Sequence, residues 1–469
     1  MKFIFKTGII LLFVMVQSLS NAQNIVRLSL DQSVNIALNN SVELRNLKID
    51  EQIQLEKNRE VIGMTMPQIT ATGMLSYYTN LPQFVFPTSD ISVYQVLSKE
   101  GVKDGNGNPI DLSNATFGKQ PISLVAPLNY QAGIDVQQLL FQPDVFIAIQ
   151  ARKAVMDYAK KNTMVAQENV KANVEKAYYG VLVAHKQKQV IQKTQERLDL
   201  LHKEMKEMLR NGFIEKLDVD KLDVSINNTR TALNQLNNSI HISESLLKNA
   251  LMLPQSDSII LTETLDGKTL SAEIFTMQHS FKYEDRKEMD LLNTAKELQQ
   301  LDLRRYKLAY APNLAAFYQF QLSGQRNKSY DIDGSGPWFS YNSGLIGLSL
   351  NQPIFDGLQK KHRIQQARLS VEKVDNMIVQ LKAGIDLEQT VARNLLDNAM
   401  LNLDIQERNI TLAESVFETT RKKYKEGLGT SIELLQADTE FQRASGGYFQ
   451  ALYDAAVAKT SYLKSLGKL

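Results

Sequence analysis

The stretch from Ile346 to Gly357 reads IGLSLNQPIFDG, and its pattern changes halfway along. Apolar residues at Ile346, Leu348 and Leu350 alternate with small or polar ones, which is the two-residue period of a strand with one apolar face. From about Gly357 to Glu426 the chain then contains no proline. A strand that runs directly into a very long helix is therefore the element that decides the fold.

A second proline-free segment runs from about Asp144 to Leu209. At 1.5 Å per residue, each segment would extend roughly 100 Å as a helix, much longer than the helices of globular domains. Apolar residues recur every three or four positions, the spacing of a coiled-coil seam. These residues are Val371, Val374, Ile378, Leu381 and Ile385, and Val219, Leu222, Ile226, Thr229, Leu233, Leu236 and Ile240. Such helices suit a protein that reaches across a gap.

Three further segments alternate like the first. Their apolar positions are Ile69, Ala71, Gly73, Leu75 and Tyr77; Tyr130, Ala132, Ile134 and Val136; and Leu314, Ala316, Tyr318, Phe320 and Leu322. Each segment has about the ten residues that a tilted strand needs to cross a bilayer. Two readings remain: membrane strands, whose outward residues Leu75, Tyr77, Tyr318, Phe320, Ile346 and Leu348 contact lipid, or amphipathic hairpins on a soluble core.

The same order of motifs occurs twice. Met66-Pro67-Gln68-Ile69 recurs as Ala311-Pro312-Asn313-Leu314, and GIDVQQ from Gly133 recurs as GLSLNQ from Gly347. After the long helices, Asn211-Gly212 with Leu217-Asp218-Val219 recurs as Glu426-Gly427 with Ile432-Glu433-Leu434. The chain is therefore predicted to be an internal duplication of helix, strand, loop, strand, long helix, turn and helix.

The N-terminus has the features of a secretory signal. Lys2 and Lys6 precede the apolar run Ile9 to Val16, and small residues at Ser20 and Ala22 predict cleavage before Gln23. The alternative, a membrane anchor, requires a longer apolar run to span about 30 Å. No later segment has about 18 consecutive apolar residues, so any membrane span is expected to be a strand.

Composition excludes several classes of protein. The 53 basic and 51 acidic residues leave a charge of +2, which gives no basis for a nucleic-acid partner. The absence of cysteine excludes disulfides and thiol chemistry. The five histidines lack metal-ligand spacing, and no nucleophile elbow or phosphate-binding loop occurs. The loop from Asp104 to Pro109 is only partly similar to a calcium loop. We predict no enzyme activity, no cofactor and no metal.

Membrane strands would force the chain to assemble with copies of itself. Unpaired strand edges cannot face lipid, because each unsatisfied backbone group costs several kcal/mol there. Four strands cannot close a barrel, since about eight is the smallest number observed. Two chains would give a side-chain-filled barrel and three an open one. These alternatives stay open at this point.

Two stretches resemble hallmark sequences of the TolC-type outer membrane efflux family: QPIFDG from Gln352 and YKEGLGTSIELLQA from Tyr424. The resemblance covers the mature chain almost end to end. It implies an α+β membrane protein, a homotrimer in which a twelve-stranded outer-membrane β-barrel with four strands per chain continues as a long α-helical coiled-coil barrel.

The corresponding domains are a signal peptide (1–22), a first repeat (23–252), an equatorial connecting segment (253–283) and a second repeat (284–469). The β-hairpins are expected at 67–141 and 313–355, and the helical turns near Gly212 and Gly427. The loop from about Asn80 to Pro127 would face outside the cell. Its function is left open.

The resemblance also implies a periplasmic gate and a docking surface at the two turns. Asp218 and Tyr424 match the family's closing residues, and Glu433 matches its first lumen-facing acid, whereas Gly429 and Gln436 replace an expected arginine and a second acid. The apolar tip residues Phe213, Ile214 and Leu428, with Gly212, Gly427 and Gly429, would contact an adaptor. Asp218 and Glu433 have an alternative role as helix-capping residues.

The predicted function is an outer-membrane exit duct of a Gram-negative bacterium. The expected partners are a periplasmic adaptor (membrane fusion) protein and an inner-membrane pump or ABC transporter, for efflux of small molecules or type I secretion. The alternative is a periplasmic coiled-coil adaptor or scaffold without a pore. An adaptor of that kind is expected to have a lipoyl-like module beside one helical hairpin, whereas this sequence has two hairpins.

Overall fold

The computed structural model describes residues 25–111, 117–276, 280–326 and 337–469. The predicted signal peptide and its cleavage point lie outside them. The chain forms two compact units. The helical unit comprises the chain up to Lys57 together with Ala151–Leu303 and Gln365–Leu469, and the strand unit comprises Asn58–Gln150 and Arg304–Ile364.

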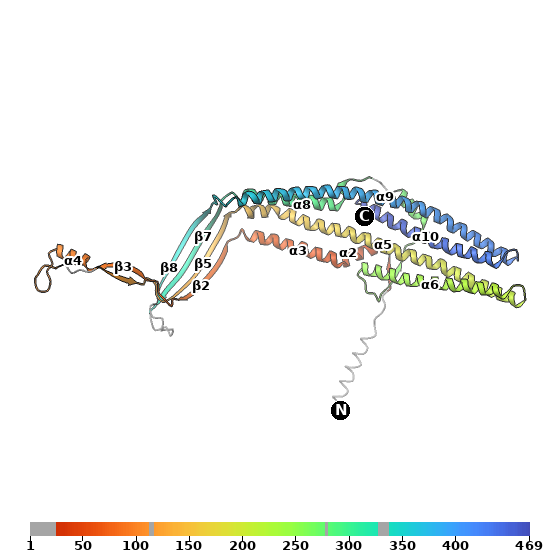
Figure 1. Ribbon diagram of the computed structural model, residues 1–469, viewed down its shortest axis with the longest axis horizontal. Coiled ribbons are helices and arrows are strands. Elements are labelled where there is room, and N and C mark those ends of the chain that lie inside the picture. Colours follow the sequence, from red (N-terminus) through yellow and green to blue (C-terminus); the bar gives the residue numbers. More distant parts are fainter. Residues whose placement is uncertain (1–24, 112–116, 277–279, 327–336) are drawn as a thin grey trace, which may run out of the picture. The chain divides into compact units, whose positions relative to one another are not determined.

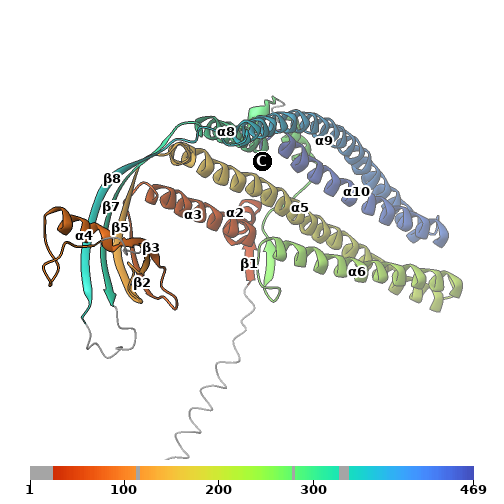
Figure 2. The same cartoon turned by 60° about the vertical axis from the view of Figure 1, so that its left-hand side comes forward.

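Two long helical hairpins make up most of the helical unit. Helix α5 (Pro143–Arg210) turns back into α6 (Lys216–Ala250), and α9 (Gln359–Lys425) turns back into α10 (Ser431–Ser465). Their turns lie at the same end of the unit (Figures 1 and 2). The predicted long helices are confirmed to within two residues at each end. At 68 and 67 residues, α5 and α9 are each about 100 Å long.

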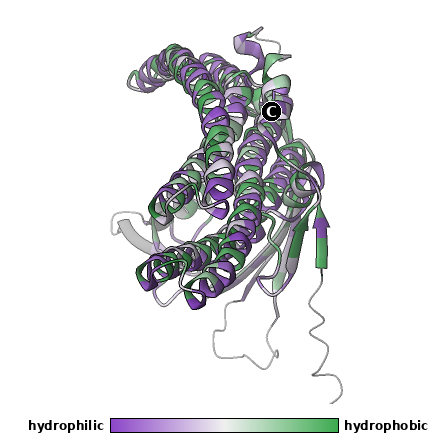
Figure 3. Ribbon diagram, turned by 90° about the vertical axis from the view of Figure 1, so that its right-hand side faces the viewer, coloured by the Kyte–Doolittle hydropathy of each residue, from purple (hydrophilic) through white to green (hydrophobic). Residues whose placement is uncertain are grey.

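Seam residues hold the hairpins together. In α6, Val219, Leu222, Ile226, Thr229, Leu236 and Ile240 are buried, and Leu233 is half-buried. Leu222, Phe417 and Phe441 are among the buried residues of one cluster drawn from α5, α6, α9 and α10. Viewed from the tips, the helices carry hydrophobic and hydrophilic residues interspersed along their length (Figure 3). The coiled-coil stripes of the sequence are therefore packing seams.

A small mixed region interrupts the helices. Strand β1 (Ile25–Leu28) pairs in parallel with β6 (Ser258–Leu261), and helices α2 (Leu30–Asn40) and α7 (Gly267–Phe275) flank them. The Tyr178 hydroxyl of α5 donates a hydrogen bond to the Leu28 carbonyl at 3.1 Å. The predicted connecting segment 253–283 thus contributes to a small sheet and a core, for which it requires the first strand of the chain.

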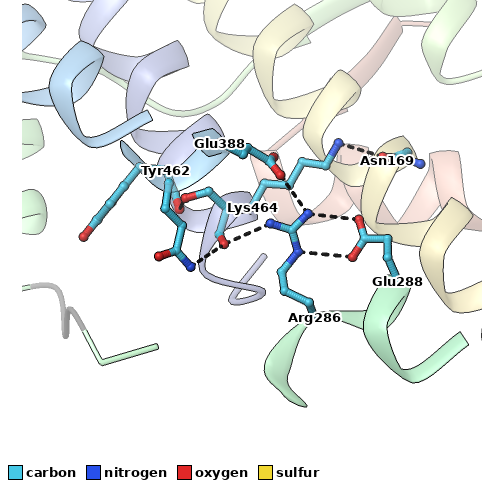
Figure 4. A network of polar contacts seen from close by, with 8 residues as sticks. Asn169, Arg286, Glu288, Glu388, Tyr462 and Lys464 are labelled. Carbon is cyan, nitrogen blue, oxygen red and sulfur yellow. Dashed lines mark hydrogen bonds and ion pairs between the residues drawn. The ribbon is translucent and has the colours of Figure 1, made fainter. Parts of the chain in front are cut away.

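A buried arginine fixes the end of α10. Arg286 stands between the short 3-10 turn η1 (Tyr283–Asp285) and α8 (Lys287–Leu308), and it is 3% exposed. Its guanidinium binds Glu288 through Nε at 3.1 Å and Nη2 at 3.2 Å, Glu388 at 2.9 Å, and the Ser465 carbonyl at 3.0 Å (Figure 4). It therefore joins α8, α9 and α10.

The strand unit contains one four-stranded antiparallel sheet. Its strands are β2 (Gln68–Tyr77), β5 (Leu128–Phe141), β7 (Asn313–Arg326) and β8 (Phe339–Asn351), in the order β2-β5-β7-β8. Helix α3 (Val42–Gly63) precedes β2 through Pro67, and α8 precedes β7 through Pro312. A proline at each junction ends the helical hydrogen-bond pattern. The four predicted strands are confirmed.

The register places the predicted outward residues on one face. Directly opposed residues share a face, and residues two apart on a strand do so too. Leu75 faces Tyr130, Ile134 faces Phe320, Val136 faces Tyr318, Tyr318 faces Ile346, and Ala316 faces Leu348. Leu75 is 71% exposed and Ile346 80%. One continuous apolar face is therefore open to the surroundings of the single chain.

The predicted loop from about Asn80 to Pro127, between β2 and β5, contains regular secondary structure. It contains β3 (Phe84–Ser89), α4 (Asp90–Lys99) and β4 (Phe117–Ile122), with β3 and β4 paired antiparallel. The β-rich sequence FVF within β3 outweighs the nearby turn signals. Asp104, part of the weak calcium-loop pattern, instead accepts hydrogen bonds from the backbone N–H groups of Asn106 and Asn108 at 2.9 and 2.8 Å.

Candidate functional site at the helical hairpin tips

Both hairpin turns use the same backbone geometry. At the first, the Phe213 N–H donates to the Met208 carbonyl at 2.9 Å and the Gly212 N–H to the Leu209 carbonyl at 3.0 Å. These are the two bonds of a Schellman motif, which places Gly212 in the left-handed region with φ of 74°. Glycine is needed there because a side chain is strained at that φ.

The second tip repeats this pattern. The Leu428 N–H donates to the Lys423 carbonyl at 2.9 Å and the Gly427 N–H to the Tyr424 carbonyl at 3.1 Å, with φ of 74° at Gly427. Gly429 has an ordinary φ and is half-buried. The two predicted turn glycines, Gly212 and Gly427, thus occupy equivalent positions in the two tips.

The apolar tip residues differ in exposure. Phe213 is 76% exposed and Leu428 80%, so the predicted exposure of these two residues is confirmed. Ile214 was expected to be exposed with them, but it is half-buried and packs against the core between the hairpins. The chain turns inward after Phe213 to begin α6, so Ile214 points toward the seam.

Glu433 has a structural role in the second tip. Its backbone N–H donates to the Thr430 hydroxyl at 3.3 Å, and its carboxylate accepts from the Thr430 N–H at 3.1 Å. This reciprocal pair is a capping box, which satisfies two of the free donors at the start of α10. Of the two roles weighed for Glu433, the structure shows the cap.

Asp218 joins the two tips of one chain. It lies in the first turn of α6, and its carboxylate accepts a hydrogen bond from the hydroxyl of Ser431 at the start of α10. Ser431 is 8% exposed. Hydrogen bonds to charged groups contribute more to stability than neutral ones, about 1.5–3 kcal/mol. Asp218 is therefore a connection between hairpins and not the side-chain cap of its own helix.

Tyr424 lies beside this connection without taking part in it. It is 6% exposed, and among the described residues its hydroxyl has no hydrogen-bond partner. Burial, and after it the negative charge of Asp218, raises the pKa of the Tyr424 phenol. Within the chain no hydrogen bond joins Tyr424 to Asp218, whose carboxylate accepts one from Ser431.

A buried polar cluster lies deeper between the hairpins. Asp438 of α10 is 1% exposed and accepts hydrogen bonds from Ser225 at 3.1 Å and Gln442 at 2.7 Å. Its second carboxylate oxygen has no partner among the described residues. Burial raises the pKa of Asp438, and the two hydrogen bonds and the charge of Arg197 only partly oppose this effect.

Arg197 of α5 lies in the same cluster. Its guanidinium stacks 5.0 Å from the ring centre of Phe417 and 5.2 Å from that of Phe441, and it binds Glu418 at 3.0 Å. This cluster was not predicted from the sequence, although Asp438 falls on the seam of α10 that Leu434, Phe441 and Ser445 define.

The described residues contain no group of three or more histidine and acidic side chains placed to hold a metal ion. His202 pairs with Asp223 at 2.9 Å and His185 with Glu244 at 2.9 Å.

Within the part of the chain that the structure describes, no helix has the length and apolar character needed to cross a membrane.

Comparisons with known proteins agree with this architecture. The sequence profile of the family "Outer membrane efflux protein" matches residues 293–468. The chain is 19% identical over 471 residues to outer membrane protein TolC of Escherichia coli, covering 96% of this chain and 84% of TolC. It is 24% identical over 220 residues to outer membrane efflux protein BepC of Brucella suis, covering 45% of this chain and only 41% of BepC.

Solved structures share the fold. The outer membrane protein VceC of Vibrio cholerae aligns with a TM-score of 0.67 at 12% identity, covering 93% of this chain and 96% of VceC. The outer membrane channel MtrE of Neisseria gonorrhoeae aligns with a TM-score of 0.63 at 14% identity, covering 93% and 88%. Residues 293–468 thus match the outer membrane efflux protein family, and the chain as a whole shares the fold of solved outer membrane channel proteins.

Proposed function

We propose that three copies of this chain form one passive exit duct for a tripartite export system. The twelve strands of the trimer line a pore through the outer membrane, and the helical hairpins continue it as a tunnel in the periplasm. The duct performs no chemical reaction. An inner-membrane pump or ABC transporter selects the cargo, which is a small molecule in an efflux system or a polypeptide in type I secretion.

The observation that carries this proposal is the isolated sheet. Its outer strands, β2 and β8, each have a single neighbour among the described residues, and its apolar face is exposed. An apolar face suits lipid, but an open edge does not, because unpaired backbone groups cost several kcal/mol each in hydrocarbon. Pairing with further copies removes the edges, and twelve strands leave an open lumen where eight do not.

The helices also have surface left for further copies. Along α9, Leu387 and Leu401 are each 65% exposed and Leu395 is 55% exposed. Burying such side chains against a neighbour contributes about 25 cal/mol per Å² of apolar surface. In the trimer these residues would form the contacts between adjacent hairpins.

The hairpin tips form the entrance and the docking surface in this proposal. Phe213 and Leu428 present exposed apolar groups on turns whose own folding requires only glycine and backbone bonds. Exposed apolar groups of this kind favour a protein partner, here a periplasmic adaptor. The bond from Ser431 to Asp218 holds the two tips of each chain together, so adaptor binding that separates them would open the entrance.

Conductance tests the proposed gate. We expect purified trimers with Asp218→Ala and Tyr424→Phe together to conduct better in planar bilayers than wild type. Ser431→Ala is the matched variant, because it removes the bond to Asp218 and leaves the carboxylate. Thr231→Ala is the control, since it removes only a hydrogen bond to the Asn227 carbonyl within α6. If the double variant is a folded trimer and conducts no better than wild type, the gate assignment is wrong.

Membrane placement tests the duct itself. The mature chain should fractionate with the outer membrane, require detergent for extraction, and run as a trimer. A scaffold without a pore would instead be released from the periplasm into aqueous buffer without detergent. Recovery of the wild-type chain as a detergent-free monomer would contradict the duct.

A further inference from the structure

The two edges of the sheet belong to β8 and β2. We propose that β8 of one copy pairs antiparallel with β2 of the next in one defined register, with Leu348 opposite Leu75, Ile346 opposite Tyr77 and Leu350 opposite Gly73. This inference rests on the proposed closure of the sheet by further copies. The register specifies which residues of β8 lie opposite which residues of β2.

The two hairpins of the sheet share one register. The sequence motifs make Ile69 of β2 the counterpart of Leu314 in β7, and Gly133 of β5 the counterpart of Gly347 in β8. When each residue is replaced by its counterpart, the pairs of the first hairpin become the pairs of the second along the whole length of β2. For example, the pair Ile69–Val136 becomes Leu314–Leu350, and Thr72–Gly133 becomes Phe317–Gly347. At the other end of β2, Tyr77–Leu128 becomes Leu322–Asn342.

The middle pairing then predicts the missing one. The pairing of β5 with β7 joins the last strand of the first hairpin to the first strand of the second. The equivalent pairing between two copies joins β8 of one copy to β2 of the next. In the middle pairing, Ile134 faces Phe320, and Ala132 faces Leu322. The counterparts of these two pairs are Leu348 with Leu75, and Ile346 with Tyr77.

The side chains at the edges fit this register. A slip of one residue would place Leu348 opposite Met74 or Ser76 and transfer the apolar set of one strand to the other face. Ile346 opposite Tyr77 is an aromatic and β-branched pair, which favours antiparallel pairing. A Cβ placed on Gly73 would meet no atom within 4 Å, and Leu350 is 67% exposed, so the space beside Gly73 can hold the Leu350 side chain.

Cysteine cross-linking in the outer membrane tests the register. The chain has no native cysteine, so each introduced pair reports alone. Within one chain, β2 and β8 are three strand spacings apart, about 14 Å, which is too far for a disulfide. The double variant Leu348→Cys, Leu75→Cys is therefore expected to give only bonds between copies. The double variant Ser349→Cys, Met74→Cys tests the same register on the polar face of the sheet. It keeps the test valid if cysteines on the apolar face disturb the packing there.

Slipped pairs are the matched controls. Leu348→Cys with Tyr77→Cys, and Leu348→Cys with Gly73→Cys, join diagonal positions about 7–8 Å apart in the proposed register, beyond the usual disulfide distance. We expect both in-register pairs to oxidise at least tenfold faster than either slipped pair, with a ladder that stops at three chains. Faster oxidation of a slipped pair would overturn the register and leave the closed duct standing. If no pair cross-links, both the register and the closure are wrong.

Discussion

Replacing Arg286 with alanine is expected to loosen the last turn of α10. The final carbonyls of a helix have no partners within it, and a positive charge there is favourable. Arg286 supplies both needs, since it donates to the Ser465 carbonyl at 3.0 Å and is held in place by Glu288 and Glu388 (Figure 4). Among the described residues, alanine would leave that carbonyl with the Gln389 side-chain amide as its remaining side-chain donor, at 3.3 Å.

The structure sets the magnitude of this effect. Removing one partner of a buried ion pair costs about 3–5 kcal/mol. The Glu388 side chain is 41% exposed, so water replaces most of its interaction, whereas the Glu288 side chain is only 26% exposed. We therefore expect the low end, about 3 kcal/mol, which corresponds to roughly 100-fold easier opening of the turn.

Hydrogen exchange measured by mass spectrometry on detergent-purified trimers checks this value. Peptides that cover the end of α10 should lose about two orders of magnitude of protection in Arg286→Ala, and less in Arg286→Lys, which cannot make the bidentate contact. Arg408→Ala is the control, because its partner Asp404 forms an exposed pair with side chains 77% and 58% exposed. Protection within threefold of wild type in Arg286→Ala would refute the reasoning.

The same site predicts an acid response. Burial by itself would raise the pKa of Glu288, but the hydrogen bonds and charge of Arg286 hold it below the ordinary value. A carboxylate with a lowered pKa in the folded state stabilises above its ordinary pKa and loses that contribution as the pH falls through the lowered value. Protection of wild type should therefore drop in acid below the ordinary glutamate pKa, and Arg286→Ala should lack this component.

Three further outcomes are expected. Asp438→Asn should raise the thermal stability at neutral pH. The pKa of Asp438 is raised in the folded chain, so Asp438 stabilises the fold in acid, and this contribution is lost as the pH rises through the raised pKa; the gain from asparagine should therefore disappear near pH 4. A gain that does not depend on pH would exclude the buried charge as its cause. Thr430→Ala should cost about 1 kcal/mol and speed hydrogen exchange in the first turn of α10, whereas Thr439→Ala, which removes only a hydroxyl bond to the Leu435 carbonyl, should not. Leu348→Lys should destabilise the trimer in lipid by about 2–4 kcal/mol if the site lies near mid-bilayer, and Ser349→Lys, on the opposite face, should be tolerated; equal losses in refolding titrations would show that the apolar face does not meet lipid.

Much of the fold follows from local pattern. The strands are readable because their side chains alternate with period two, and the prolines at 67 and 312 mark the junctions. The long helices are readable because their seams repeat every three or four residues. Each of these signals resides within one segment, so no knowledge of distant residues is needed.

The tips were only partly readable. Gly212 and Gly427 adopt the left-handed conformation that their turns require, and Glu433 forms a cap with Thr430, a pair separated by three residues. The partner of Asp218, Ser431, could not be read from local pattern, because the two residues lie on different hairpins more than two hundred positions apart.

Sequence by itself determined the four long strands, the two long helical hairpins and their order, because helix period, strand period and turn glycines act over a few residues. Tertiary structure decided which of these elements touch. The parallel pairing of β1 with β6, the burial of Asp438, and the capture of the α10 terminus by Arg286 each join residues far apart in the chain. Such contacts depend on the balance of burial, charge and hydrogen bonding where helices meet, and that balance is set only once the chain has folded.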